Sequence, residues 1–400
     1  MSTRSMSAAL RSLGCRRGAV LSGFAFRSHR TFSSTASNAV RAVFTETDNA
    51  ELNTILQSIQ NSIILPAHLP EKQREIVFDP KKRSFLEQNP IVIELDGLEH
   101  KFSPIDRFKG VENSKKALAK ALDNMHSADD WANLSTLLAG FKKARIKLKP
   151  THWGRIVRLA GIRGHVYAII ECAKQSDKTG LFLKTPEVVL RVLAFVNDKI
   201  SNSSGAAAES KQALTWVEMV LDLLQRPEHV MPAQQTRERL HYSPLVRGLV
   251  LYARASAANT GKAGERELDL LRDDVTLLTS LWQDAVGKDL VEVAEFAKMN
   301  PTLERKANQG GNHAPRALNG SAYTQVLAQN IKGVELAQQV LGQEAAEGLS
   351  PILKTLESHL QDFATTSEQR TDEWAKEYEK VMGKKPDWPA VGNKTVAADA

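Results

Sequence analysis

The chain has 400 residues, of which 42% are hydrophobic and 25% are charged, a mixture typical of folded globular proteins rather than disordered or fibrous ones. Its two cysteines are too few for a disulfide framework or a cysteine-rich zinc site, and it lacks the run of 18 apolar residues that would predict a transmembrane helix. The formal net charge of +7 is compatible with nucleic-acid binding, so its position in the chain matters.

The N-terminal segment carries the whole of this net charge. It holds seven arginines before the first acidic residue, Glu46, and serine and alanine are abundant between them. An N-terminus that is rich in Arg and Ser and free of acid is typical of a mitochondrial transit peptide. We therefore predict a transit peptide over residues 1–32, with cleavage near Phe32, and a location in the mitochondrial matrix. A disordered N-terminus with an accidental bias is the alternative.

The next part of the chain is predicted to be extended and then to form a hairpin. Residues 33–90 are interpreted as a linker and a proline-rich extended arm, because four prolines interrupt any long helix, although residues 51–64 have the spacing of a short amphipathic helix. In residues 91–102, Asp96 and Gly97 separate two short runs, and Asp-Gly favours the positive φ angles of a type I′ turn. We predict a small β-hairpin there.

From Gly110 onward the hydrophobic period becomes helical. Candidate helix pairs start at Ser114, Thr151 and Thr185, which are 37 and 34 residues apart. Two helices per unit at this spacing are typical of helical solenoids. The predicted fold class is all-α, with a solenoid-like body of helical hairpins and a small N-terminal β-hairpin.

Changes in composition predict how the chain is divided. The predicted parts after the arm are the β-hairpin with repeat-like helical pairs (91–200), a linker (201–210), a helical block (211–299), a loop (300–321), two C-terminal helices (322–382) and a tail (383–400). Whether the residues from 211 to 382 pack on the repeat-like pairs stays open.

The sequence carries no catalytic or metal-binding signature. It has no glycine-rich phosphate loop, no nucleophile elbow and no His or Cys spacing typical of a metal site. Adjacent carboxylates such as Asp129–Asp130 and Asp273–Asp274 fit helix capping or solvated faces. Cys172, which would remain after cleavage, lies in an apolar helical pattern and is expected in the core. We predict that the protein is not an enzyme and uses no cofactor, metal ion or small-molecule substrate; an enzyme with dispersed catalytic residues is the weaker alternative.

Residues 141–163 are the most unusual local feature, with eight basic residues and no acid. Such a surface can hold RNA phosphates through salt-sensitive contacts that do not read sequence. The alternatives are a solvated face or a face that pairs with the acidic C-terminal helices. Trp131 and Trp153 lie nearby, but their apolar stripes favour core packing over base stacking. The candidate RNA-binding residues are Lys142, Lys143, Arg145, Lys147, Lys149, Arg155, Arg158 and Arg163.

The run from Trp131 to Val196, and especially Thr151-His152-Trp153 through to Thr185, resembles pentatricopeptide-type repeats over about two units. The one-base-per-repeat code of that family is not carried over to these residues. In general character, through its N-terminus, its repeat-like helices and its tail, the chain is similar to the lineage-specific helical proteins of fungal mitochondrial ribosomes.

This resemblance implies a structural component of the mitochondrial ribosome that contacts rRNA and neighbouring ribosomal proteins through a basic helical face. We lean towards the large subunit, although the sequence does not decide between the two. One alternative is a pentatricopeptide-like factor for mitochondrial RNA maturation or translation, and another is an assembly factor for a respiratory complex. The sequence leaves open whether RNA contact is direct and whether it is sequence-specific.

Overall fold

The fold is helical apart from one pair of strands in the part of the chain that the computed structural model describes. The predicted all-α class with a small N-terminal β-hairpin is confirmed. The predicted transit peptide over 1–32 and its cleavage point lie outside the described residues, as do parts of the predicted loop (300–321) and tail (383–400). The described residues are 41–106, 112–232, 235–260, 263–303, 318–368 and 370–389.

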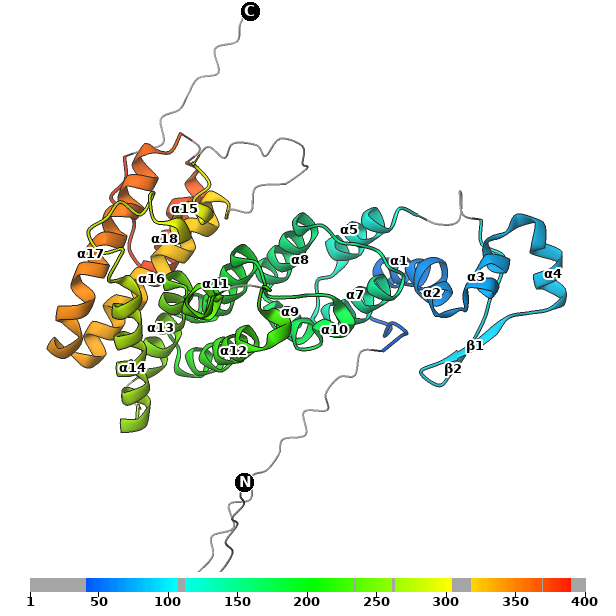
Figure 1. Cartoon of the computed structure of the whole chain (residues 1–400), viewed down its shortest axis with the longest axis horizontal. Coiled ribbons are helices and arrows are strands. Elements are labelled where there is room, and N and C mark those ends of the chain that lie inside the picture. The colour runs from blue at the N-terminus through cyan, green and yellow to red at the C-terminus, as the bar shows by residue number, and fades with distance from the viewer. Residues whose placement is uncertain are drawn as a thin grey trace, which may run out of the picture. The chain divides into compact units, whose positions relative to one another are not determined.

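The N-terminal helices are short, and several begin next to prolines (Figure 1). They replace the extended arm that the sequence predicted. Pro70 is the N-cap of one helix and Pro80 opens a 3-10 turn, positions at which a missing N–H breaks no helical hydrogen bond. The prolines therefore separate short helices instead of preventing them. The elements are α1 (Ala50–Ile59), a π-helical turn (Gln60–Ile64), α2 (Leu65–His68), α3 (Glu71–Phe78), the 3-10 turn (Pro80–Lys82) and α4 (Arg83–Gln88).

The predicted hairpin is present, with β1 (Val92–Leu95) paired antiparallel to β2 (Leu98–Lys101). Asp96 and Gly97 have φ angles of 50° and 77°, as a type I′ turn requires. Because both central residues need positive φ, the Asp-Gly pair sets the register that joins Leu95 to Leu98.

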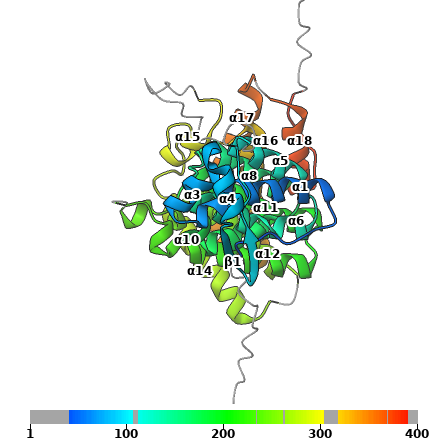
Figure 2. The same ribbon diagram turned by 90° about the vertical axis from the view of Figure 1, so that its right-hand side faces the viewer.

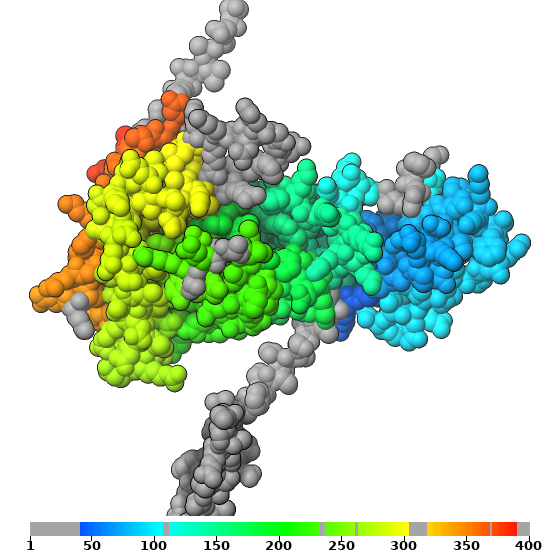
Figure 3. Space-filling view, in the orientation of Figure 1, coloured from blue at the N-terminus to red at the C-terminus, as the bar shows by residue number. Residues whose placement is uncertain are grey.

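The hairpin packs with α2, α3 and α4 on a small apolar cluster of its own. In Figure 2, α3, α4 and β1 face the viewer in front of the helical body. The fully buried members of this cluster are Leu65, Leu69, Val77, Leu86 and Phe102. The main core begins with α1, which packs against α5 through Leu52 and Leu56, and Figure 3 shows the surfaces of the first helices adjoining those that follow.

The central helices form stacked hairpins. Helix α8 is followed by α9 and α11 by α12, and contacts join α8 to α11 and α9 to α12. Helix α5 also packs against α8, so the predicted repeat-like units lie side by side. The bounds are α5 (Ser114–Asn124), α6 (Ala128–Ala132), α7 (Leu134–Lys143), α8 (Pro150–Ile162), α9 (Val166–Lys174), α10 (Ser176–Thr179), α11 (Pro186–Asn202) and α12 (Ala207–Gln225).

The segment 201–210, which the sequence predicted to be a linker, is mostly helical. Helix α11 runs to Asn202 and α12 begins at Ala207, so a tight turn alone separates them. Ser204 and Gly205 supply the positive φ angles of that turn. The alanines were interpreted as linker composition, but alanine is the strongest helix former and here it opens a helix.

The C-terminal helices pack on the repeat-like pairs, which the sequence had left open. Helix α13 contacts α11, α12 and α16. A Cβ on Gly333 of α16 would lie 2.8 Å from the backbone nitrogen of Tyr252 in α13, so the close approach of these helices requires glycine. The two predicted C-terminal helices over 322–382 are three, because α17 ends at Thr366 and α18 begins at Asp372. The bounds are α13 (Pro244–Ala258), α14 (Glu265–Trp282), α15 (Ala294–Met299), α16 (Gly320–Leu341), α17 (Gln343–Thr366) and α18 (Asp372–Met382), with 3-10 turns at Pro227–His229, Thr236–Glu238 and Leu240–Tyr242.

Several residues predicted to be structural lie where expected. Trp131 is 1% exposed and Trp153 packs against the main core. Cys172 is buried, and burial raises the pKa of its thiol. Asp130 completes a capping box with Ser127 at the start of α6. Within the described residues, no helix is both long and apolar enough to cross a membrane.

Candidate nucleic-acid interface

The eight basic residues predicted to contact RNA lie at the end of α7, in the loop over 144–149 and along α8. Lys142 and Lys143 occupy the last turn of α7, where positive charge is favoured by the helix dipole. The loop ends where Pro150 opens α8, and the ring of His152 accepts a hydrogen bond from the backbone N–H of Lys149 at 3.1 Å.

Arg145 sits in a left-handed conformation with φ of 58° just beyond α7. Its N–H donates to the carbonyl of Lys142 at 3.0 Å, and the N–H of Ile146 donates to the carbonyl of Phe141 at 2.9 Å. These two bonds form a Schellman motif, whose left-handed position is usually filled by glycine. The chain therefore ends α7 with an exposed arginine at a position that disfavours a side chain.

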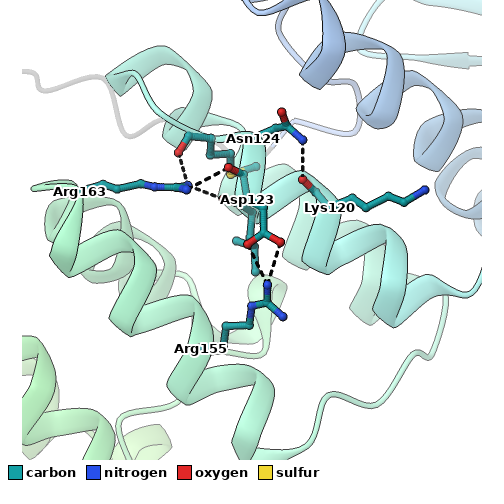
Figure 4. Close-up of polar contacts among 7 residues, drawn as sticks. Lys120, Asp123, Asn124, Arg155 and Arg163 are labelled. Carbon is teal, nitrogen blue, oxygen red and sulfur yellow. Dashed lines mark hydrogen bonds and ion pairs between the residues drawn. The ribbon is translucent and has the colours of Figure 1, made fainter.

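Arg155 and Arg163 are engaged within the protein (Figure 4). One nitrogen of Arg155 lies 2.8 Å from both carboxylate oxygens of Asp123. Arg163 donates to the carbonyls of Leu122, Asp123 and Met125 at 2.5, 2.9 and 2.6 Å, so it caps the C-terminus of α5. Both arginines therefore join α8 to α5, Arg163 through both of its terminal nitrogens and Arg155 through one nitrogen of a side chain that stays 42% exposed.

Lys142 also makes contacts within the protein, although it is exposed overall. Its ammonium group donates to the carbonyl of Ser176 at 3.2 Å and to that of Asp177, and it lies 5.8 Å from the centre of the Phe182 ring. These contacts join the end of α7 to α10. The charge itself has no carboxylate partner among the described residues.

The other five predicted residues are exposed and form no ion pair with a carboxylate in the part of the chain that the structure describes. The ion pairs do not show this run pairing with the acidic C-terminal helices. The carboxylate that pairs with it among the described residues is that of Asp123 in α5. The five residues are Lys143, Arg145, Lys147, Lys149 and Arg158.

Part of the basic run lines a groove of about 680 Å³ together with residues from distant segments. The sequence does not predict a place in this groove for Arg41, Arg74 and Lys178, because they come from before α1, from α3 and from α10. No local pattern marks them, and only the fold brings them together. We call this feature the cationic groove, and its basic residues are Arg41, Arg74, Lys142, Lys143, Arg145 and Lys178.

Backbone hydrogen bonds position the chain that carries Arg41. The carboxylate of Asp96, in the hairpin turn, accepts from the N–H groups of Ala42 and Val43 at 2.6 and 3.1 Å. Asn133 accepts from the N–H of Thr45 at 2.8 Å and donates to its carbonyl at 2.9 Å. The hairpin and α7 therefore hold this segment at the edge of the groove.

The groove is strongly positive. Glu71 and Asp177 are the acidic residues among the described residues that line it, against the six basic ones. His68 also lines the groove, and burial together with the nearby Lys143 ammonium lowers the pKa of its imidazole. The lowered pKa keeps His68 neutral at neutral pH, so lysines and arginines carry the positive charge.

By its fold and its groove, the chain belongs to a general class of proteins that are built of stacked helical hairpins and carry an exposed basic surface. Comparison with known proteins gives the family. The model of the family "Mitochondrial ribosomal protein mS27" matches residues 30–384, and the chain belongs to this family. It is 31% identical over 240 residues to the small ribosomal subunit protein mS27 of Neurospora crassa, an alignment that covers 58% of this chain and 61% of that relative.

These comparisons confirm the resemblance to fungal-type mitochondrial ribosomal proteins. The family is one of ribosomal proteins and not of enzymes, and it is mitochondrial, as the sequence predicted. The lean towards the large subunit is not confirmed, because the relative is a small-subunit protein. A helical scaffold can be built into either subunit, so composition and periodicity held no information on that point.

Proposed function

We propose that this protein is a structural component of the small subunit of the mitochondrial ribosome, where it contacts rRNA and neighbouring ribosomal proteins through its basic helical face. Membership of the mS27 family over residues 30–384 is the observation that carries the proposal. The basic residues from the end of α7 to α8 that form no ion pair with a carboxylate in the described ranges agree with it, since rRNA would supply the missing negative charge.

In this role the protein needs no chemistry beyond positioning. Stacked helical hairpins present rigid faces, and lysine and arginine side chains contact phosphates and displace their counterions. Phosphate contacts set the place and orientation of a protein on RNA without reading sequence. The proposed contact residues are the exposed members of the run, because Arg155 and Arg163 already hold α5.

Sedimentation of mitochondrial lysate in a magnesium-containing gradient tests the proposal. The tagged full chain should sediment with the rRNA of the small subunit, and low magnesium should shift both to lighter fractions together. Recovery of the chain in light fractions alone, with intact small subunits elsewhere in the gradient, would overturn the proposal.

The stacking of α8–α9 on α11–α12 favours a second candidate, a pentatricopeptide-like factor acting on mitochondrial transcripts. Such a factor would bind single-stranded messenger RNA along its helical pairs. Ultraviolet crosslinking followed by sequencing of the bound RNA separates the two candidates: rRNA reads support the ribosomal role, and predominantly messenger reads support the second.

A further inference from the structure

We propose that the cationic groove between α2, α3, α7 and α10 is a binding site for the sugar–phosphate backbone of an RNA strand. This inference rests on the proposed ribosomal function and deepens it, because it places RNA contact at residues that lie outside the basic run as well as within it. The residues from outside the run are Arg41, Arg74 and Lys178.

The first support is uncompensated charge. None of the six basic residues of the groove forms an ion pair with a carboxylate in the described ranges. Other cations of the same chain are paired: Arg254 lies 2.5 Å from Asp274, and Lys380 lies 3.1 Å from Asp198. Cations that share one groove repel each other, so a bound polyanion would relieve that repulsion.

The second support is the size and lining of the groove. Its volume of about 680 Å³ lies within the range of about 300–1,000 Å³ typical of ligand sites, so it holds more than a lone phosphate. The described lining includes no Phe, Tyr or Trp, and its one aromatic ring is the imidazole of His68, so it offers no row of aromatic side chains for successive bases to stack on. Backbone phosphates are the part of RNA that this lining suits.

The third support is the backbone at Arg145. Its left-handed conformation costs roughly 1–2 kcal/mol for a residue with a side chain, and glycine would avoid that cost. Strained positions of this kind cluster at binding sites, where the side chain is needed. Arg145 lines the groove, so the strained residue is one whose guanidinium charge would contact the RNA backbone.

Arginine makes up half of the basic set, through Arg41, Arg74 and Arg145. A guanidinium group can present two parallel donors to a phosphate, and it keeps its charge at any physiological pH. An acidic protein segment could also present anions, but the ribosomal family of this chain favours RNA as the occupant. The acidic segment is therefore an outcome of the test.

The test compares two double variants of the full chain that lose equal charge. Arg74→Gln with Lys178→Gln removes two groove cations from outside the basic run, and Lys384→Gln with Lys385→Gln removes two exposed cations that lie outside both the groove and the basic run. Fluorescence anisotropy measures binding of a labelled oligouridine of about 15 nucleotides over a range of salt concentrations. Unlabelled polyglutamate serves as the competitor, and thermal melting checks that both variants fold.

The groove variant should bind oligouridine about tenfold more weakly, and its slope of log affinity against log salt should fall by about 1.4, as for two lost phosphate contacts on a single strand. The control variant should change affinity by less than about twofold. Equal losses in both variants would overturn the proposal. Displacement of oligouridine by polyglutamate at equal charge concentration would also overturn it, in favour of an acidic protein partner.

Sedimentation separates this inference from the proposed function. A groove variant that binds oligouridine like the unmodified chain, while the chain still sediments with the small subunit, would remove the groove site and leave the ribosomal role. If binding depends on the groove residues but the chain sediments only in light fractions, the ribosomal role would be removed and the groove site would stand.

Discussion

Arg145 combines a disfavoured backbone conformation with a charge that lines the cationic groove. The Schellman motif that ends α7 needs a left-handed residue, and the chain places an exposed arginine there in place of the usual glycine. The basic run was visible in the sequence, but the conformation of this residue was not. Positive φ depends on where the helix stops, and helix ends are the least predictable part of a helix.

Replacing Arg145 with glycine should therefore raise the free energy of unfolding by about 1 kcal/mol, because glycine adopts positive φ without the steric cost. It should also weaken RNA binding, because a groove cation is lost. Urea denaturation and oligouridine anisotropy measure the two effects.

Lys147→Gly is the matched control, since it removes the same charge from the same loop at a residue whose φ is not positive. It should give no gain in stability. A loss of stability in Arg145→Gly would contradict the account of strain at this position.

At the scale of elements, side-chain contacts fix how the helical pairs stack. Arg163 of α8 donates to three carbonyl groups at the end of α5, where a helix has few backbone donors left for its last carbonyls. Arg155 adds an ion pair to the same helix. The charge pattern predicts RNA contact for both residues, because such a pattern does not reveal which arginines meet a neighbouring helix end.

Arg163→Ala should lower the free energy of unfolding by about 1–3 kcal/mol, because the charge-assisted hydrogen bonds to the carbonyls at the end of α5 are lost. Arg158→Ala is the control: it removes the same charge from the same helix at an exposed residue, and surface changes of this kind stay within about 0.5 kcal/mol. Chemical denaturation measures both. Equal destabilisation by the two variants would refute the capping role of Arg163.

At the scale of the described body, a buried polar contact joins helices that are distant in sequence. Asp198 of α11 accepts from Gln325 of α16 at 2.8 Å and pairs with Lys380 of α18 at 3.1 Å. Burial raises the pKa of the Asp198 carboxyl to about 6, and the Lys380 ammonium opposes part of that rise. At a pH between these two values, the Asp198 carboxyl therefore keeps its proton in the folded protein and loses it in the unfolded chain, where its pKa is near 3.8.

This difference predicts a pH dependence of stability. Between pH 4 and 6 the folded state binds more protons than the unfolded state, so the free energy of unfolding should fall as pH rises through that window. The loss attributable to Asp198 is at most about 3 kcal/mol. Urea denaturation at several pH values should give a flatter profile for Asp198→Asn than for the unmodified chain, and parallel profiles would contradict the raised pKa.

Local patterns in the sequence predict the helical class, the Asp-Gly hairpin and the helices of the repeat-like units, because hydrophobic period, caps and turn residues act locally. The arginines of the N-terminus and the basic run also indicate the kind of protein. The prediction was wrong for the proline-rich segment, where tertiary packing stabilises short helices, and for residues 201–210, where alanines read as a linker open a helix.

The packing of the helices determines which cations remain available for a partner. It turned Arg155 and Arg163 towards α5, and it brought Arg41, Arg74 and Lys178 to the end of α7. The physical reason is that charge at a surface depends on which segments the fold places side by side, and the apolar core that places them is formed by residues far apart in the chain.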